Sequence, residues 1–279
     1  MILATEDDRP AIEAFLTDHI TTSMFPLSNL RRFGMAGGHS RAVRFWCRWR
    51  AGALTDVLTV TEEGMVFPQC PTGPWGEARV VLAGLAVKGI MGDGAQVAAL
   101  RAALGLTQKG ALDDEDPLYR LALDDLQMPD VAGLTLGSIA DAPRELVNGW
   151  RRDYLEEVLP IPAEEFQMTA VKDVTSYAEA DSHRVLYDAD VPVAMTGFNA
   201  VLPEAVQIGG VYTPPALRSR GLARRAVALH LAQARDVGIG HAILFAASAQ
   251  ACKAYEAIGF KRTGTFTMLV YEQPQVIHG

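Results

Sequence analysis

Cysteine and histidine are scarce in this sequence of 279 residues. Its three cysteines, Cys47, Cys70 and Cys252, are scattered and form no C-x-x-C pair. This spacing excludes a disulfide framework and favours a reduced, cytoplasmic protein. The six histidines show no H-E-x-x-H motif or other metal-ligand spacing, so we predict that the protein has no metal site.

Long apolar segments and excess positive charge are lacking too. The longest apolar run extends from Val80 to Val87, well short of the ~20 residues that a membrane helix needs. Residues 1–10 do not show the basic-then-apolar order of a signal peptide. We therefore expect a soluble, intracellular protein without a membrane partner.

The net charge of −8 argues against nucleic-acid binding in general, because neutralising phosphates requires a basic surface. The same charge is compatible with a cationic or amine substrate. Residues of apolar type make up 49% of the chain, which is enough for a substantial core. The length suits two domains of about 140 residues each. Pro129 and Gly133 mark the predicted boundary, giving domains at 1–130 and 131–279.

The first domain is predicted to mix helices and strands. Apolar spacing predicts one or two helices over residues 9–35 and another over 96–104. Residues 88–95 are rich in glycine and are predicted to form a loop. Alternating or continuous apolar patterns predict strands at 42–49, 53–60, 64–68, 80–87 and 118–123.

Residues 80–104 are thus predicted to run strand, glycine loop, helix, as residues 208–237 do. We interpret the first half as a degenerate copy of the second, on element order and not on residue identity. The loop at 88–95 has no arginine and no G-K-[S/T], and Asp93 would repel a pyrophosphate. We expect a structural or substrate-shaping role for residues 1–130, with cofactor binding there as the open alternative.

The second domain is predicted to begin with a strand at 134–139. A helix from Asp141 to Val158 follows, ended by Pro160 and Pro162, and a second helix covers 163–180. Apolar patterns then predict strands at 183–187, 191–199, 205–213 and 241–246, helices at 222–237 and 248–258, and closing strands within 260–272. Gly209-Gly210 inside a strand points to a bulge or a close backbone approach.

One stretch carries phosphate-binding chemistry. Residues 218–223, Arg-Ser-Arg-Gly-Leu-Ala, fit the pattern [Q/R]-x-x-G-x-[G/A] where a strand gives way to a helix. The first N–H groups of a helix lack intrahelical partners and lie at the positive end of its dipole, so such an end binds phosphate. Small residues at Gly221 and Ala223 allow a ligand to approach the backbone. Arg224 and Arg225 add positive charge beside it.

This stretch resembles the acetyl-coenzyme-A signature of the GNAT superfamily of N-acetyltransferases. A second run, from Ala251 through Tyr255 to Gly259-Phe260, is similar to the family's A-x-x-x-Y-x-x-x-G-F motif. The element order over 134–272 also follows the family. The resemblance implies an α/β (α+β) fold of two GNAT-like domains in tandem, each a mixed, mostly antiparallel sheet flanked by helices.

The resemblance also implies roles for particular residues. Backbone groups at Val211 and Thr213 would pair with the pantetheine arm of acetyl-CoA, and an N–H near Val211 or Tyr212 would polarise the thioester carbonyl. Tyr255 would protonate the departing thiolate. The family often has Asn where this chain has Ser248, which leaves that cofactor contact open. The pyrophosphate would be held by Arg218, Ser219, Arg220, Gly221, Leu222 and Ala223.

The base that takes the proton of the amine is not fixed by the sequence. Glu204 is the first candidate, and a water chain without a single base is an alternative. Asn199 and Tyr212 are candidates for the acceptor pocket, although both could be ordinary sheet residues. Further candidates for the base are His183, Glu165, Asp173 and Glu272.

The leading hypothesis is an acetyl-CoA-dependent N-acetyltransferase in which a primary amine attacks the thioester directly in a ternary complex. Nothing nominates a nucleophile for an acyl-enzyme, since Cys252 has no evident histidine partner. The acceptor would be a small-molecule amine or a protein amine. The alternative is a module that binds or senses acyl-CoA without turnover. A relative that transfers from tRNA would need a basic surface that this chain lacks.

Overall fold

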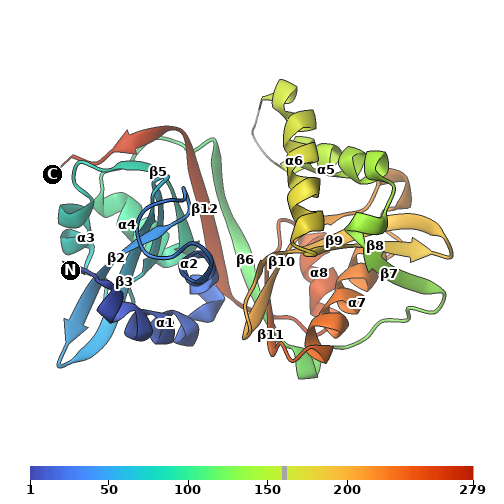
Figure 1. Cartoon of the computed structure of the whole chain (residues 1–279), viewed down its shortest axis with the longest axis horizontal. Coiled ribbons are helices and arrows are strands. Elements are labelled where there is room, and N and C mark those ends of the chain that lie inside the picture. Colours follow the sequence, from blue (N-terminus) through green and yellow to red (C-terminus); the bar gives the residue numbers. More distant parts are fainter. Residues whose placement is uncertain (159–161, 279) are drawn as a thin grey trace. The chain divides into compact units, whose positions relative to one another are not determined.

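The computed structural model describes residues 1–158 and 162–278 and divides into two compact units (Figure 1). The first unit comprises Met1–Leu118 together with the segment from Gly264 onward, and the second comprises Tyr119–Thr263. The division falls at 118/119, whereas the sequence places the boundary at 130/131. Pro160, which we expected to end a helix, lies outside the described residues.

Each half of the chain runs through the same order of elements: strand, two helices, three strands, helix, strand, helix, strand. The first run consists of β1 (Ile2–Leu3), α1 (Arg9–Asp18), α2 (Ile20–Phe33), β2 (Val43–Arg50), β3 (Ala53–Thr61), β4 (Met65–Gln69), α3 (Trp75–Leu82), β5 (Ala86–Asp93), α4 (Gly94–Ala103) and β6 (Leu112–Ala122).

The second run consists of β7 (Leu134–Ser138), α5 (Arg144–Val158), α6 (Phe166–Glu179), β8 (His183–Asp188), β9 (Val191–Val201), β10 (Ala205–Tyr212), α7 (Leu222–Asp236), β11 (His241–Phe245), α8 (Ala249–Glu256) and β12 (Lys261–Val276). Short 3-10 helices lie at η1 (Glu6–Asp8), η2 (Leu123–Asp125), η3 (Ile139–Asp141), η4 (Ala163–Glu165) and η5 (Pro215–Leu217).

The last strands of the two runs are exchanged in part: β6 passes from the first unit into the second at Leu118/Tyr119, and β12 passes from the second unit into the first at Thr263/Gly264. In the first unit the strand order is β1-β2-β3-β4-β5-β12, with β4 and β5 parallel and β12 antiparallel to β5. In the second unit the order is β11-β10-β9-β8-β7, with β10 and β11 parallel, and β6 lies beside β11. Figure 1 shows β12, in red, running along β5.

This exchange corrects the prediction that residues 260–272 close the second domain. Most of β12 completes the sheet of the first unit instead, where Phe266 pairs with Asp93 and Leu269 with Ile90. The buried side chains of Leu269, Tyr271 and Ile277 belong to the apolar core of that unit. Long-range pairing of this kind leaves no local pattern, because β12 has the same apolar alternation whichever sheet it joins.

The predicted strand at 80–87 and loop at 88–95 are also wrong. Residues up to Leu82 form α3, in which Ala78 and Leu82 are fully buried while Val80 is 74% exposed. That spacing fits a helical face and not a continuous buried strand. Gly84 has a φ of +81° in the turn that follows, and the expected loop is strand β5. In the second unit, residues 213–221 lead into α7. The corresponding segment of the first unit, which leads into α3, is therefore 70–74.

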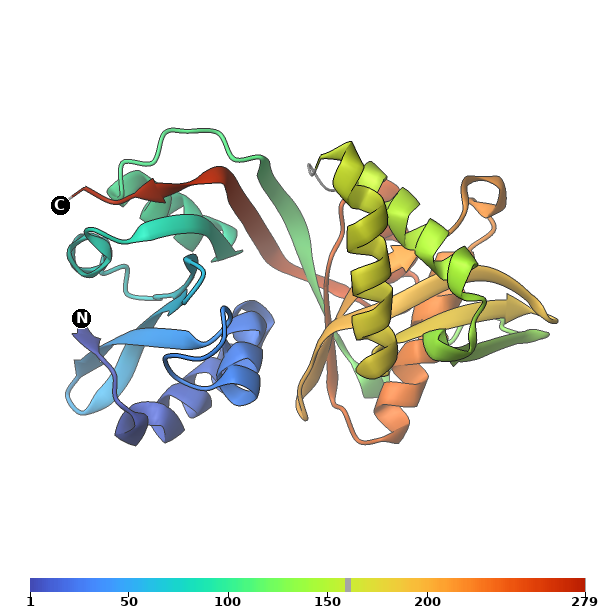
Figure 2. The same cartoon turned by 45° about the horizontal axis from the view of Figure 1, so that its top comes forward.

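Helices cover both faces of the sheet in the second unit (Figure 2). On one face Val147 and Trp150 of α5 and Val174 of α6 pack against Val185 and Met195. On the other face α7 and α8 pack against β9, β10 and β11, in a cluster that includes Phe198, Ile208, Val227, Leu244 and Tyr255. The sheet is thus the middle layer of three, and a ligand can reach its backbone only where the strands separate.

Among the described residues, no helix combines the length and apolar character needed to cross a membrane. The three cysteines carry free thiols, and burial raises the pKa of Cys47 to about 12. The structure therefore gives Cys47 a role in packing and not as a reactive thiol.

We predict that ending the chain after Thr263 unfolds the first unit, because this removes β12 and three buried side chains of its core. Deleting such side chains costs about 2–5 kcal/mol each, against a total stability of about 5–15 kcal/mol for a domain. Hydrogen exchange should show loss of amide protection throughout β2–β5. A chain that ends after Ile277 is the control and should keep this protection. Full protection in the shorter chain would contradict the role given to β12.

Candidate functional site

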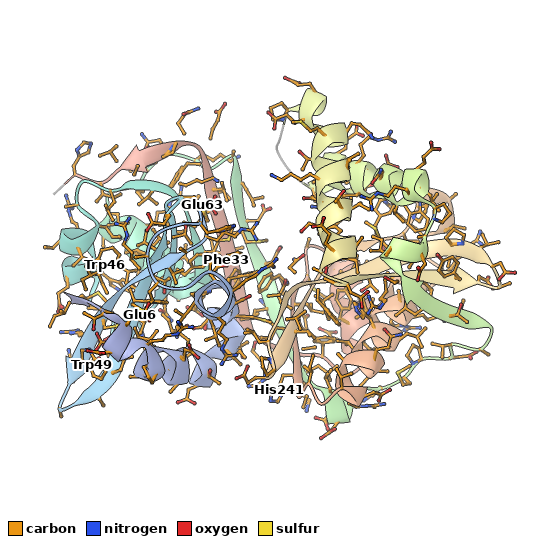
Figure 3. The ribbon with its side chains drawn as sticks, viewed as in Figure 1. Glu6, Phe33, Trp46, Trp49, Glu63 and His241 are labelled. Atoms are coloured by element: carbon orange, nitrogen blue, oxygen red, sulfur yellow. The ribbon has the colours of Figure 1, made fainter. Side chains whose placement is uncertain are left out.

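The two parallel strands of the second unit separate partway along their length. β10 and β11 pair at Ala205 with His241, Val206 with Ala242 and Gln207 with Ile243. His241, labelled in Figure 3, is the first residue of β11. Within the described residues this pairing ends at Gln207, although β10 continues to Tyr212. The carbonyl of Ile208 accepts a hydrogen bond from the side-chain amide of Gln207 at 2.7 Å. Backbone groups from Gly209 onward on this side of β10 are therefore the ones available to a ligand that lies along the strand.

A bulge shapes β10 at the same place. Its pairing with β9 shifts between Gly209 and Tyr212, so that Gly210 and Val211 oppose a single residue of β9. Gly210 has a φ of +62°, a left-handed conformation that glycine adopts without steric cost. This confirms the bulge predicted from Gly209-Gly210. The bulge leaves Gly210 and Val211 outside the regular ladder with β9, which resumes at Tyr212.

The segment after β10 forms a tight loop that ends at a helix N-terminus. η5 is followed by Ser219 with φ +64° and Gly221 with φ +72°, and α7 begins at Leu222. The N–H of Arg225 donates to the carbonyl of Gly221 and starts the ladder of α7. The N–H groups of Leu222, Ala223 and Arg224 precede that first bond and so have no partner within the helix. The predicted motif thus folds into a loop that presents amides at a positive helix end.

Guanidinium groups surround Gly221. A Cβ at this glycine would lie 3.5 Å from Arg225 Nη1 and 3.6 Å from Arg224 Nη2. Arg225 is fixed by bonds to the carbonyls of Asp130 and Arg220, both at 2.7 Å. Carbonyl oxygens orient this side chain but leave its positive charge uncompensated. The loop therefore combines bare amides with fixed cations, a combination that suits phosphate.

Arg218 has a different environment. Its Nε donates to the carbonyl of Thr213 at 2.9 Å, and its Nη2 contacts both carboxylate oxygens of Glu157, at 2.6 and 2.9 Å. Its guanidinium also lies over the ring of Tyr212, 5.6 Å from the centroid. The sequence motif does not reveal Glu157, because this residue lies on α5 and meets the loop only in the folded unit.

Tyr255 is buried on α8, 9% exposed, with its ring edge-on to Phe260. Burial, with a smaller contribution from the nearby Tyr154, raises the pKa of its phenol. The phenol is therefore neutral at physiological pH and carries a proton that it can donate. Ser248 caps α8, where its hydroxyl accepts the N–H of Ala251 at 3.1 Å. The structure thus gives Ser248 a local structural role.

Asn199 is the unpaired residue of β9 at a second register shift, between Gln207 and Ile208. A Cβ at Gly209 would lie 1.9 Å from the amide nitrogen of Asn199, so the side chain of Asn199 covers this glycine. Glu204 lies elsewhere, immediately before β10 at the end where β10 and β11 are still paired. Seven residue-to-residue steps along the strand, at about 3.3 Å each, separate Glu204 from Val211. The structure does not bring Glu204 together with Tyr255 and the bulge.

The other candidates for the base are also placed. Asp173 forms an ion pair with Arg151 at 2.6 Å, and Glu165 ends the 3-10 helix η4. Glu272 lies on β12 in the part that belongs to the first unit. His183 is fully buried at the start of β8, and burial, followed by Arg151 and Arg184, lowers its pKa to about 3.

His183 marks a cluster that the sequence does not reveal. Its ring stacks on Tyr177 at 3.5 Å and lies over Gly197, where a Cβ would come within 2.0 Å of it. Arg151 lies over the rings of both Tyr154 and Tyr177, at 4.9 and 5.5 Å. These aromatic residues form the α5–α6 side of the unit beneath the bulge. The glycine at 197 was the available signal, but the sequence alone does not show that its cross-strand partner in the β8–β9 hairpin is His183.

The corresponding segment of the first unit is closed by its own side chains. In segment 70–74 the N–H of Cys70 donates to Gln96 at 2.6 Å, and the N–H of Thr72 donates to the buried carboxylate of Asp56 at 2.8 Å. Gly73 donates to the carbonyl of Cys70, and the two remaining residues, Pro71 and Pro74, have no N–H. This segment has no amide left for a diphosphate, and its nearest anion is an internal carboxylate.

Among the described residues, no group of three His, Cys, Asp or Glu side chains is arranged to hold a metal ion.

The two units differ in the segment that leads into the helix after the third strand of the run. The second unit presents separated strands, a bulge and a basic loop, whereas the first unit presents a loop whose donors are satisfied.

Residues 144–260 match the sequence model of the acetyltransferase (GNAT) family. No curated protein matches the chain. A GCN5-related N-acetyltransferase from Sphaerobacter thermophilus is 15% identical, with a TM-score of 0.56 over 100% of this chain and 96% of its own. A GCN5-related N-acetyltransferase from Kribbella flavida is 20% identical, with a TM-score of 0.52 over 78% of this chain and 87% of its own.

A tandem GNAT protein from the clavulanic acid biosynthesis pathway is 14% identical, with a TM-score of 0.53 over 96% of both chains. At these identities the solved structures show a common fold, a mostly antiparallel sheet flanked by helices. The matched residues 144–260 contain the separated strands, the bulge, the basic loop and Tyr255. This part of the chain is therefore a domain of the acetyltransferase (GNAT) family.

Proposed function

We propose that the protein is an N-acetyltransferase that uses acetyl-CoA to acetylate a primary amine by direct attack in a ternary complex. The observation that carries this proposal is the coincidence, within 16 residues of chain from Gln207 to Leu222, of the end of strand pairing, the bulge and the basic helix N-terminus. The family match is consistent with it.

The residues present fit acetyl-CoA. The hydroxyl of Thr213 and the Nε of Arg224 are buried and have no hydrogen-bond partner among the residues that the structure describes. Both flank the loop, and unpaired buried polar groups cost about 1–3 kcal/mol each, so a ligand that pairs with them is favoured. In the proposal Val211 and Thr213 pair with the pantetheine arm through their backbone. Residues 218–223 hold the diphosphate.

Acetyl-CoA supplies an acyl group activated as a thioester. The protein contributes an N–H at Val211 or Tyr212, which donates to the thioester carbonyl and stabilises the negative charge that develops there. Fixed donors of this kind are worth about 3–4 kcal/mol. In the proposal the acceptor approaches from the α5–α6 side, where the hydroxyl of Tyr212 and the carboxylate of Asp153 lie.

Tyr255 donates its proton to the sulfur that leaves. Its raised pKa makes proton transfer to a thiolate in water unfavourable, but the sulfur shares the same apolar surroundings, which raise its proton affinity as well. A neutral phenol close to the sulfur is therefore a suitable donor.

His183 cannot retain the proton of an ammonium group, because its pKa of about 3 lies far below that of an amine. Glu204 is separated from the bulge by most of β10. We propose that the proton leaves through water on the α5–α6 side, where Asp153 approaches the hydroxyl of Tyr212 at 3.5 Å.

We predict that Tyr255→Phe lowers kcat by about 100-fold or more, since it removes the proton donor, and leaves the affinity for CoA nearly unchanged. The assay measures release of free thiol with a panel of small amines, amino acids, polyamines and peptides with free N-termini. Tyr271→Phe makes the same chemical change at a buried position of the first unit and should leave kcat unchanged. Absence of thiol release from the parent protein with every amine would instead indicate a module that binds acyl-CoA without turnover.

We predict that Gly221→Asp abolishes CoA binding in calorimetry, while the parent protein binds one CoA per chain. The new carboxylate would lie beside Arg224 and Arg225 and repel the diphosphate. Gly221→Ala is the control: it carries at least as much backbone strain at positive φ, about 1–2 kcal/mol, without the charge, and should weaken binding far less. Equal affinities for the aspartate variant and the parent would refute the assignment of this loop, and two CoA per chain would refute the closure of segment 70–74.

A further inference from the structure

The ion pair between Glu157 and Arg218 links the basic loop to α5. Both carboxylate oxygens of Glu157 contact Nη2 of Arg218, at 2.6 and 2.9 Å, and each side chain is 43% exposed. Glu157 lies in the last turn of α5, while Arg218 directly follows η5. An acidic side chain therefore neutralises a cation of the loop that would hold the diphosphate.

Arg218 is kept at the loop by contacts that do not depend on Glu157. Its Nε donates to the carbonyl of Thr213, five residues earlier, and its guanidinium lies over the ring of Tyr212. If the carboxylate were replaced, these two contacts would still hold the guanidinium beside η5. The Nη groups that Glu157 now occupies are the part of the side chain that can turn to a new anion.

The charge of Arg218 is handled differently from that of Arg225. Arg225 donates to carbonyl oxygens of Asp130 and Arg220, which fix its position and leave its full charge to act on a ligand. The carboxylate of Glu157 cancels the charge of Arg218 and also raises the pKa of that guanidinium through a hydrogen bond. A diphosphate bound at the loop would find Arg218 already paired with Glu157. It would also be repelled by the negative charge of Glu157.

We propose that Glu157 is an internal competitor of the cofactor: it binds Arg218 in the free protein, and the diphosphate of the acyl donor displaces it. The proposal rests on the function proposed above, since it assumes that the loop binds CoA. Displacement releases the end of α5 from the loop when the donor binds. Glu157 thereby lowers the affinity for CoA and links the donor loop to the helix on the acceptor side.

The test is a calorimetric titration of the full chain with CoA at low ionic strength. Exposed ion pairs contribute little, so Glu157→Gln should strengthen CoA binding by roughly 1.4- to 5-fold. The gain should shrink at high salt, since exposed charges are screened. Glu156→Gln is the matched control, because it removes the same charge from the neighbouring position of α5 and should produce a smaller gain.

A double-mutant cycle with Arg218→Gln isolates the competition. Arg218→Gln should weaken CoA binding, and adding Glu157→Gln to it should then have no more effect than adding Glu156→Gln. Equal gains from Glu157→Gln and Glu156→Gln in the parent chain, or weaker binding by Glu157→Gln, would overturn the proposal. A parent chain that does not bind CoA would overturn the proposed function itself, which is a distinct result.

Discussion

The site depends on one constraint, that backbone hydrogen-bonding groups must find partners. In a parallel pair the N–H and C=O groups of one strand are satisfied by the other strand. After Gln207, β10 is no longer paired with β11. On the other side of β10, Gly210 at positive φ forms a bulge in the pairing with β9. What remains is a stretch of strand whose groups require a ligand or water, held rigidly between two layers of helices.

The first unit shows how the same sequence of elements removes that requirement. Its segment 70–74 is short, carries two prolines and directs its remaining amides to Gln96, Asp56 and Cys70. Asp56 is fully buried, and its carboxylate takes bonds from Thr55 and Thr72. An intramolecular carboxylate thus occupies the role that we propose for an external anion in the second unit. The two halves of the chain differ less in architecture than in which groups satisfy one loop.

Local features of the site could be predicted from the sequence because a few consecutive residues determine them. Gly209-Gly210 indicates the bulge, and Arg218 to Ala223 indicate a helix end that binds anions. Features that depend on partners distant in sequence could not be predicted. Glu157, for example, meets Arg218 from another helix, 61 residues away in the chain. The stretch 80–87 was misassigned because a short apolar run fits both a buried strand and a helix, and only the exposure of Val80 distinguishes them.

The exchange of β12 also has a consequence for biosynthesis. Residues 264–276 leave the ribosome after the whole of the second unit, yet they supply a strand and core side chains to the first. Until then the edge of β5 is open, and open strand edges are templates for association with other chains. The usual order, in which an N-terminal domain folds first during synthesis, is therefore not accessible to this chain. Its two halves must mature together, and the interval before the last strand arrives is when chaperones would matter most.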